Sequence, residues 1–265
     1  MQSDIAVLEE FYASRQGQLA RRLIGHQLRQ LWSDLSGRVA VGLGYAVPFL
    51  PALEGSERTV ALVPQSTNIP SSARGISSTV DGLGRIAFVQ GEDLPLADGS
   101  VDRLLLAHAL ETSLKPRRLM REVWRVLADG GRLVAVVPNR RGLWCWSERT
   151  PFGHGQPFSA GQLEKMLRGY LFEPLAMRRA LYLPPTGSSL LLRFAVPAER
   201  LGLRFASQLS GVVLVEAEKR IYLPPVETVK ARKARKRVYA PVPQGVTATE
   251  PAPIAARERS GIGGS

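Results

Sequence analysis

The stretches GEDLPLADGSVDRLLLAHALE (residues 91–111) and REVWRVLADGGRLVAVVPN (residues 121–139) decide the fold of this chain. Each stretch holds one continuous apolar run, at residues 101–107 and 132–137. Such runs are typical of parallel strands that are covered on both faces, whereas a half-exposed strand alternates between apolar and polar residues. We therefore expect two parallel strands here.

The segment between these two runs has the pattern of a helix that crosses from one strand to the next. Leu119 and Val123 recur on one helical face, and Pro116 suits the first turn. Gly130-Gly131 is expected to end the helix, because glycine readily takes the left-handed conformation found at helix ends. A strand, a crossover helix and a parallel strand form a right-handed βαβ unit.

Further apolar runs extend this pattern along the chain. Runs at residues 38–41, 59–63 and 85–89 precede the βαβ unit, and runs at 175–183 and 211–217 follow it. The repetition of strand and connection predicts an α/β fold of the Rossmann-like, doubly wound type.

The chain is expected to have three parts. Residues 1–35 form a helical segment with an apolar stripe on one face, and Gly17 is the expected position of a break in it. Residues 36–223 form the α/β domain. Residues 224–265 are rich in proline, alanine and basic residues, so they are predicted to be a disordered tail that buries too little apolar surface to offset its ordering entropy.

The positive charge is unevenly placed, because the residues from Val226 onward carry +5 of the net charge and the much longer rest of the chain carries +7. The net charge is +12, and the sequence KARKARKR at Lys230–Arg237 packs six basic residues into eight. Such a segment suits an anionic partner, either a nucleic acid or a membrane surface, and a merely solubilising tail is the alternative. Base stacking is not indicated, because no aromatic residue interrupts the segment before Tyr239.

Nothing in the sequence predicts export. The first residues, MQSDIAVLEE, carry acids where a signal peptide has a basic region, and no apolar run approaches the ~20 residues that span a bilayer. Cys145 is the single cysteine, which excludes an internal disulfide and suits a reducing compartment. We therefore expect a cytoplasmic protein with no transmembrane segment.

Residues 91–139 resemble the class I S-adenosylmethionine-dependent methyltransferases, in particular those of the methyltransferase-11 type, and the resemblance is looser over residues 36–220. It implies about seven strands with an antiparallel last strand, helices on both faces, S-adenosylmethionine as cofactor, and methyl transfer. The residues that carry it are Glu92-Asp93-Leu94-Pro95, Asp98-Gly99-Ser100, Asp102, Arg125-Val126-Leu127 and Gly130-Gly131.

The resemblance also implies which residues hold the cofactor, beginning with the glycine turn after the first strand. The positions are Gly42, Gly44 and Tyr45 for the methionine part, Pro64 and Gln65 for the ribose, Gln90, Glu92, Asp93 and Leu94 near the adenine, and Ala107 beside the reacting methyl group.

Three positions depart from the family pattern. Ala40 stands where an acid usually precedes the first glycine, and Ala46 replaces the third glycine. Neither Pro64 nor Gln65 is acidic, although a carboxylate usually binds both ribose hydroxyls there. Losing a charge-assisted hydrogen bond costs ~1.5–3 kcal/mol, so the cofactor motifs are degenerate and weaker binding is expected.

Candidate catalytic and acceptor residues follow the fourth and fifth strands. His108 is placed to act as a general base for a hydroxyl or amine acceptor, and the alternative is that it only packs or hydrogen-bonds there. Glu111 is expected to be a solvated or structural carboxylate. Trp144, Trp146 and His154 are candidate acceptor contacts, or members of a small satellite core. No metal-ligand spacing is present, so no metal site is predicted.

Three functions remain open. The first is an S-adenosylmethionine-dependent methyltransferase with an unidentified acceptor. The second is a catalytically inactive binding or regulatory protein with the same fold, which the degenerate positions favour. A nicotinamide-dependent oxidoreductase is the third, and the missing third glycine and missing ribose acid disfavour it.

Overall fold

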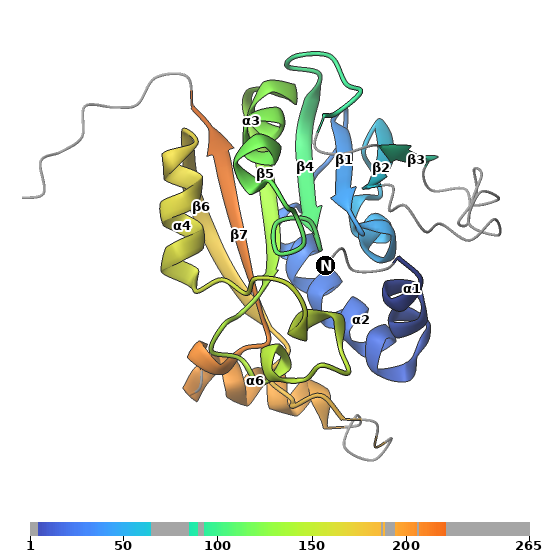
Figure 1. Cartoon of the computed structure of the whole chain (residues 1–265), viewed down its shortest axis with the longest axis vertical. Helices are drawn as coiled ribbons and strands as arrows, with labels where there is room; N and C mark the ends of the chain where they lie inside the picture. The colour runs from blue at the N-terminus through green and yellow to red at the C-terminus, as the bar shows by residue number, and fades with distance from the viewer. Residues whose placement is uncertain are drawn as a thin grey trace, which may run out of the picture. The chain divides into compact units, whose positions relative to one another are not determined.

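Seven strands form one sheet in the computed structural model of the chain, in the order β3-β2-β1-β4-β5-β7-β6 (Figure 1). Strand β7 runs antiparallel to both of its neighbours, β5 and β6, and all other strand pairs are parallel. The expected doubly wound, mostly parallel sheet with an antiparallel last strand is confirmed. The strands are β1 (Val39–Gly44), β2 (Arg58–Pro64), β3 (Arg85–Val89), β4 (Val101–Ala107), β5 (Leu127–Pro138), β6 (Phe172–Ala180) and β7 (Val212–Lys219).

The structure describes residues 5–64, 85–89, 93–186, 188, 194–205 and 207–220. Contacts divide the chain into two units, Met1–Pro224 and Pro225–Ser265. The second unit, and with it the basic segment Lys230–Arg237, lies outside the described residues. In the part of the chain that is described, no helix combines the length and the apolar character needed to cross a membrane.

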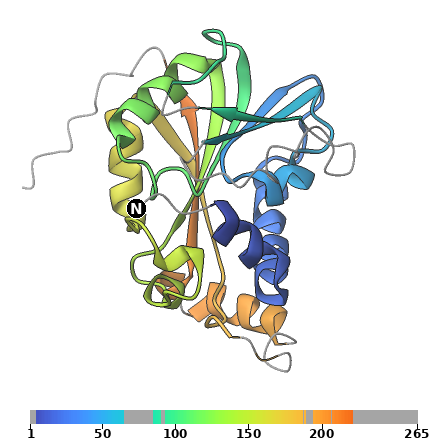
Figure 2. The same ribbon diagram turned by 45° about the vertical axis from the view of Figure 1, so that its right-hand side comes forward.

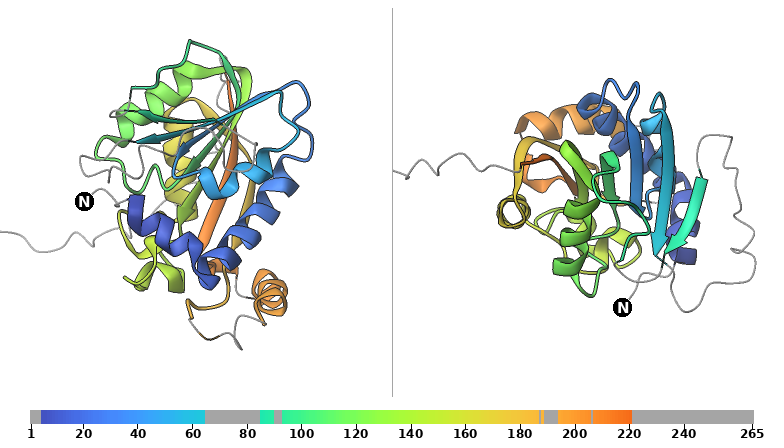
Figure 3. Two further views of the ribbon diagram at one scale, coloured as in Figure 1. Left: turned by 90° about the vertical axis from the view of Figure 1, so that its right-hand side faces the viewer. Right: turned by 90° about the horizontal axis from the view of Figure 1, so that it is seen from above.

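Helices cover both faces of the sheet, as predicted (Figure 3). One core lies under α2 (Arg15–Leu31) and the 3-10 helix η1 (Val47–Leu53), and the other lies under α3 (Pro116–Val126) and α4 (Ala160–Gly169). Along β4, Leu105 belongs to the first core and Leu104 to the second. Successive side chains of a strand point to opposite faces, which explains why the buried strands have continuous apolar runs.

The remaining helical elements lie in connections or before the sheet. They are α1 (Ile5–Ala13), the 3-10 helices η3 (Leu143–Trp146), η4 (Pro151–Gly153) and η5 (Ser207–Leu209), and α6 (Ala195–Phe205).

The N-terminal helical segment breaks at Ser14, so the expected break at Gly17 is wrong. The Ser14 side chain accepts a hydrogen bond from the Gly17 amide and caps the start of α2. Gly17 lies inside α2, where a Cβ would fall 1.9 Å from the Phe11 carbonyl oxygen. Its role is therefore the close approach of α1 and α2.

The end of α3 also differs from the expectation. The helix stops at Val126, and its cap Leu127 already has extended backbone angles, so Gly130-Gly131 does not terminate it. Gly130 instead has a φ of +69° inside β5, at the shift in register between β4 and β5. The glycine pair turns the start of a strand, a signal that resembles a helix end when read from sequence alone.

Candidate functional site

The point where the strand order reverses, between β1 and β4, defines the candidate site. Gly44 ends β1 and pairs with Ala107, which ends β4, and the Tyr45 amide donates to the Ala107 carbonyl at 2.8 Å. Doubly wound sheets bind ligands outside the carboxyl ends of the strands at such a switch point. Figures 1 and 2 show α1 beside this edge of the sheet, where the arrowheads of β1 and β4 end.

Both glycines of Gly42-Leu43-Gly44 meet a packing requirement of the fold. A Cβ on Gly42 would fall 2.6 Å from the Ala46 Cβ. Gly44 has a φ of +86°, and a Cβ there would fall 2.2 Å from the Ala107 carbonyl oxygen. Gly42 thus allows the segment after β1 to pack closely on the strand, and Gly44 allows the ends of β1 and β4 to approach each other, whether or not a ligand is bound.

His108 leaves β4 with its side chain buried at this edge. It has a φ of +52°, uncommon for a non-glycine residue, and is only 6% exposed. Its Nε2 atom lies 2.7 Å from the Tyr12 hydroxyl of α1, and its Nδ1 atom lies 3.2 Å from Oε1 of Glu111. Tyr12 of α1 therefore meets two polar side chains, His108 and Glu111, that follow β4.

The environment of Tyr12 favours its neutral phenol. Burial raises the pKa of Tyr12 well above its usual value, and the nearby Glu111 and Tyr45 raise it further. A neutral phenol can donate to Nε2 of His108 or accept from it, depending on the imidazole tautomer. In the tautomer with the proton on Nδ1, facing Glu111, Nε2 carries the basic lone pair and accepts from Tyr12.

Glu111 is a buried carboxylate, which excludes the solvated role and leaves the structural one of the two that the sequence predicted. The residue is 3% exposed. Although its Oε1 is close to His108, neither carboxylate oxygen has a hydrogen-bond partner among the described residues. A buried carboxylate without such partners is costly, and it could accept hydrogen bonds from a ligand.

Aromatic side chains from three separate regions surround His108. The Tyr12 ring stacks on Tyr45 and contacts Phe49, and Phe152 lies 5.1 Å from the His108 ring between centroids. Burial raises the pKa of Tyr45 to about 12. The part played by α1 was missed in the sequence, where the adjacent Phe11 and Tyr12 were the available signal.

The predicted acceptor residues do not gather in one place. Trp144 is buried beside Phe11 and Phe152, and its Nε1 donates to the Leu183 carbonyl at 2.7 Å. Trp146 is 80% exposed, and the His154 Nε2 atom lies 2.9 Å from the Glu148 carbonyl within the same loop. The structure thus brings Trp144 alone of the three to the aromatic group around His108.

The predicted adenine loop is held by helix α3. Arg125 donates to the Leu94 and Leu96 carbonyls, and Arg118 pairs with Asp93. The Arg125 contacts give a structural reason for the arginine in the family motif. Pro64 is exposed at the end of β2. The predicted cofactor residues Gln65, Gln90 and Glu92 lie outside the described residues.

The sheet order, with its switch point between β1 and β4, defines a class I Rossmann-like domain. The family model described as a methyltransferase domain matches residues 39–135, which run from β1 into β5. Residues 39–135, less than half of the chain, are therefore similar to a methyltransferase domain.

One curated relative is an uncharacterised protein from Mycobacterium tuberculosis strain H37Rv. It is 31% identical over 107 residues, and the match covers 38% of this chain and 38% of the relative. The shared segment is thus well under half of either protein.

Solved structures support the fold at low sequence identity. An S-adenosylmethionine-dependent methyltransferase from Thermotoga maritima has a TM-score of 0.57 at 18% identity, covering 80% of this chain and 94% of that chain. One from Archaeoglobus fulgidus has a TM-score of 0.51 at 17% identity, covering 75% and 94%. The cyclase SpnF has a TM-score of 0.51 at 19% identity, covering 77% and 82%. The same fold thus occurs in proteins whose names describe different reactions, methyl transfer and cyclisation.

Proposed function

We propose that the protein is an S-adenosylmethionine-dependent methyltransferase that acts on a hydroxyl or amine acceptor. The observation that carries the proposal is the buried group of Tyr12, His108 and Glu111 beside the switch point of a methyltransferase domain. The residues that would hold the cofactor are Gly42, Gly44, Tyr45, Pro64, Gln65, Gln90, Glu92, Asp93, Leu94 and Ala107.

The residues at the switch point suit part of this cofactor. The Glu111 carboxylate has no hydrogen-bond partner among the described residues, so it could accept bonds from an ammonium group. At the ribose position, the described residues Val63 and Pro64 supply no carboxylate. The fit therefore favours the methionine end of the cofactor over its ribose.

The bound cofactor supplies an electrophilic methyl group, and the protein supplies position, desolvation and a base. The acceptor oxygen or nitrogen forms the new bond to the methyl carbon while the carbon–sulfur bond breaks. The acceptor proton passes to Nε2 of His108, whose lone pair the Nδ1–H tautomer leaves available. Glu111 stabilises the resulting imidazolium because its carboxylate lies 3.2 Å from Nδ1.

The hydrogen bond between Tyr12 and His108 must break before His108 can act as a base. The Tyr12 hydroxyl occupies the Nε2 lone pair at 2.7 Å, so an acceptor has to replace this hydrogen bond with its own. Trp144, Trp146 and His154 are proposed to contact the acceptor on the other side. Helix α1 therefore acts as the movable wall of the site.

The direct test is calorimetry of the full chain with S-adenosylmethionine, followed by transfer of a tritiated methyl group to fractionated cell extract. We expect saturable binding and labelling of one acceptor fraction. No binding at millimolar cofactor would refute the proposal. The Tyr12→Phe variant should transfer methyl groups at least as fast as the parent chain, because it frees Nε2 without opening a cavity.

A second candidate is a binding or regulatory protein that no longer transfers methyl groups. The capped Nε2 of His108 and the lack of an acid at Val63 and Pro64 favour it. Cofactor binding without labelling of any fraction, in both the parent chain and Tyr12→Phe, would support this candidate over the first.

Two further proposals concern the chain outside the site. We propose that residues 1–35, 36–223 and 224–265 act as a helical segment, a methyltransferase-like domain and a basic tail, of which the tail lies outside the described residues. Lys230–Arg237 is proposed to bind an anionic partner, either a nucleic acid or a membrane surface, because six of its eight residues are basic. A cytoplasmic location is the corresponding proposal for the cell.

A further inference from the structure

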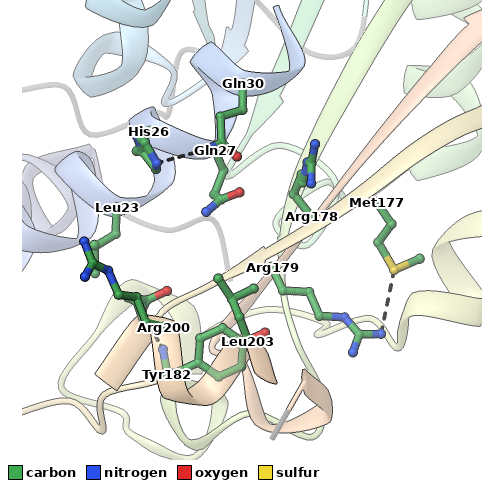
Figure 4. A pocket seen from close by; sticks show the side chains of 11 residues that line it. Leu23, His26, Gln27, Gln30, Met177, Arg178, Arg179, Tyr182, Arg200 and Leu203 are labelled. Atoms are coloured by element: carbon green, nitrogen blue, oxygen red, sulfur yellow. Dashed lines mark hydrogen bonds between the residues drawn. The ribbon is translucent and has the colours of Figure 1, made fainter. Parts of the chain in front are cut away.

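A pocket of about 650 Å³ lies between α2, β6 and α6 (Figure 4). Its volume is in the range of small-molecule sites. None of its lining residues belongs to the candidate methyl-transfer site. Helix α2 contributes Leu23, His26, Gln27 and Gln30, and the other residues are Met177, Arg178, Arg179, Tyr182, Glu199, Arg200 and Leu203.

The wall formed by α6 is fixed in position by polar and close contacts. The Glu199 carboxylate accepts a hydrogen bond from the Tyr182 amide at 2.7 Å, next to Leu181 with its φ of +68°. Gly202 lies so close to the Tyr182 ring that a Cβ would fall 2.2 Å from it. The pocket therefore has one wall defined by specific contacts.

Two guanidinium groups give the pocket its charge. Among the described residues, neither Arg178 nor Arg200 forms an ion pair, and both are exposed. The lining carboxylate, Glu199, is 7% exposed and is used by the Tyr182 backbone, and burial raises its pKa. The side chains that can reach a ligand are thus cationic or neutral.

Arg179 points differently from Arg178, because neighbouring residues of a strand face opposite sides. Its guanidinium extends to the Met177 sulfur at 3.7 Å, and Met177 packs against the core under α3 and α4 (Figure 4). Arg178 therefore faces α2, and Arg178 on β6 and Arg200 on α6 line the pocket from two different walls (Figure 4).

The rest of the lining is apolar and continues onto the surface. Leu23, Leu203 and Tyr182 contribute hydrocarbon surface inside the pocket. Outside it, α6 and the preceding residue expose Leu201 and Phe194, each 63% exposed, which is unusual for large apolar side chains. An anionic head near the arginines and an apolar body along α6 would match both kinds of surface.

We propose that this pocket binds an amphipathic anion, a small molecule with a carboxylate or phosphate head and a hydrocarbon body. The head would lie between Arg178 and Arg200, and the body would lie against Leu23 and Leu203. The proposal does not depend on methyl transfer, because the two sites share no residue.

The test is calorimetry of the full chain, without cofactor, using decanoate below its micelle concentration. We expect saturable binding, weakened roughly 10–100-fold in the double variant Arg178→Gln/Arg200→Gln, since two charge-assisted contacts are lost. The matched control is Arg29→Gln, which removes an exposed arginine from a part of α2 outside the pocket and should leave binding unchanged. Leu203→Gln tests the apolar half and should also weaken binding.

Three outcomes would overturn the proposal. The first is no saturable binding, and the second is equal binding of decanol, which has the same body without the charge. The third is a combined result in which decanoate does not bind, the parent chain binds phosphatidylglycerol vesicles, and the double variant does not. The two arginines would then contact a membrane surface and not a small molecule. Decyl phosphate distinguishes the heads: tighter binding than decanoate assigns a phosphate, and weaker binding assigns a carboxylate.

Discussion

The connection after β3 has exposed carboxylates, whereas the connection after β4 has a buried one, although both connections begin at the same edge of the sheet. The side chains of Asp93 and Asp98 are 65% and 79% exposed and pair with arginines of α3. The Glu111 side chain is 1% exposed and lies beside the equally buried His108. An exposed ion pair contributes ~0–1 kcal/mol, whereas losing a partner of a buried polar group costs ~1–3 kcal/mol.

This difference separates polar residues that shape the loop from those that are available for chemistry. The polar groups after β3 are satisfied within the protein, because Arg125 donates hydrogen bonds to backbone carbonyls and to Glu122. After β4, the carboxylate of Glu111 remains without a hydrogen-bond partner among the described residues. We therefore expect the second connection to control activity and the first to control stability.

The largest effect is expected from His108→Asn, which tests the chemical role of the second connection. Asparagine tolerates a positive φ but cannot act as a base, so methyl transfer should fall by about 10²–10⁴-fold while the fold is retained. The measurement is the rate of tritiated methyl transfer, with circular dichroism as the control for folding. An unchanged rate would show that His108 only packs at this edge.

Gly44→Ala should lower the free energy of unfolding by roughly 3 kcal/mol or more, since it combines backbone strain with a clash against the Ala107 carbonyl. Its control is Gly99→Ala in the connection after β3, which also has a positive φ, of +62°, but no close neighbour. That variant should cost only about 1–2 kcal/mol. Urea unfolding of both variants checks the difference, and equal losses would contradict the proposed close contact.

Arg125→Ala should cost about 1–3 kcal/mol, because it removes hydrogen bonds to the Leu94 and Leu96 carbonyls and to Glu122. Cofactor affinity should fall with it if Leu94 borders the adenine. The midpoint of urea unfolding and the calorimetric affinity are the two readouts. A stable variant with normal affinity would remove Arg125 from the structural role assigned to it.

Arg118→Ala should have the smallest effect, at most about 1 kcal/mol, because the Arg118 and Asp93 side chains are both more than half exposed. The loss should shrink further at high salt, which screens exposed pairs. Comparing thermal unfolding in low and high salt tests this expectation. A larger loss that salt does not reduce would mean that this pair shapes the loop as strongly as Arg125 does.

The sequence predicts the sheet well because each buried strand is a continuous apolar run, as at β4 and β5. It fails at Gly17 and at Gly130, where glycine signals a break but serves close packing in one case and a strand irregularity in the other. For Glu111 the sequence left a solvated and a structural role open, since exposure depends on what covers a loop. Tyr12 of α1 is separated from His108 by 96 positions, and no local pattern encodes that contact.

The hydrogen bond between Tyr12 and His108 has a consequence for how the protein is made. The tyrosine leaves the ribosome long before the histidine that it will contact. Helix α1 can pack on α2, and Tyr12 on Tyr45, before β4 is made, but the Tyr12 hydroxyl lacks its partner His108 until β4 has been synthesised and paired. During that interval Phe11 also lacks its aromatic partners Trp144 and Phe152. Assembly of this group of side chains is therefore a late step.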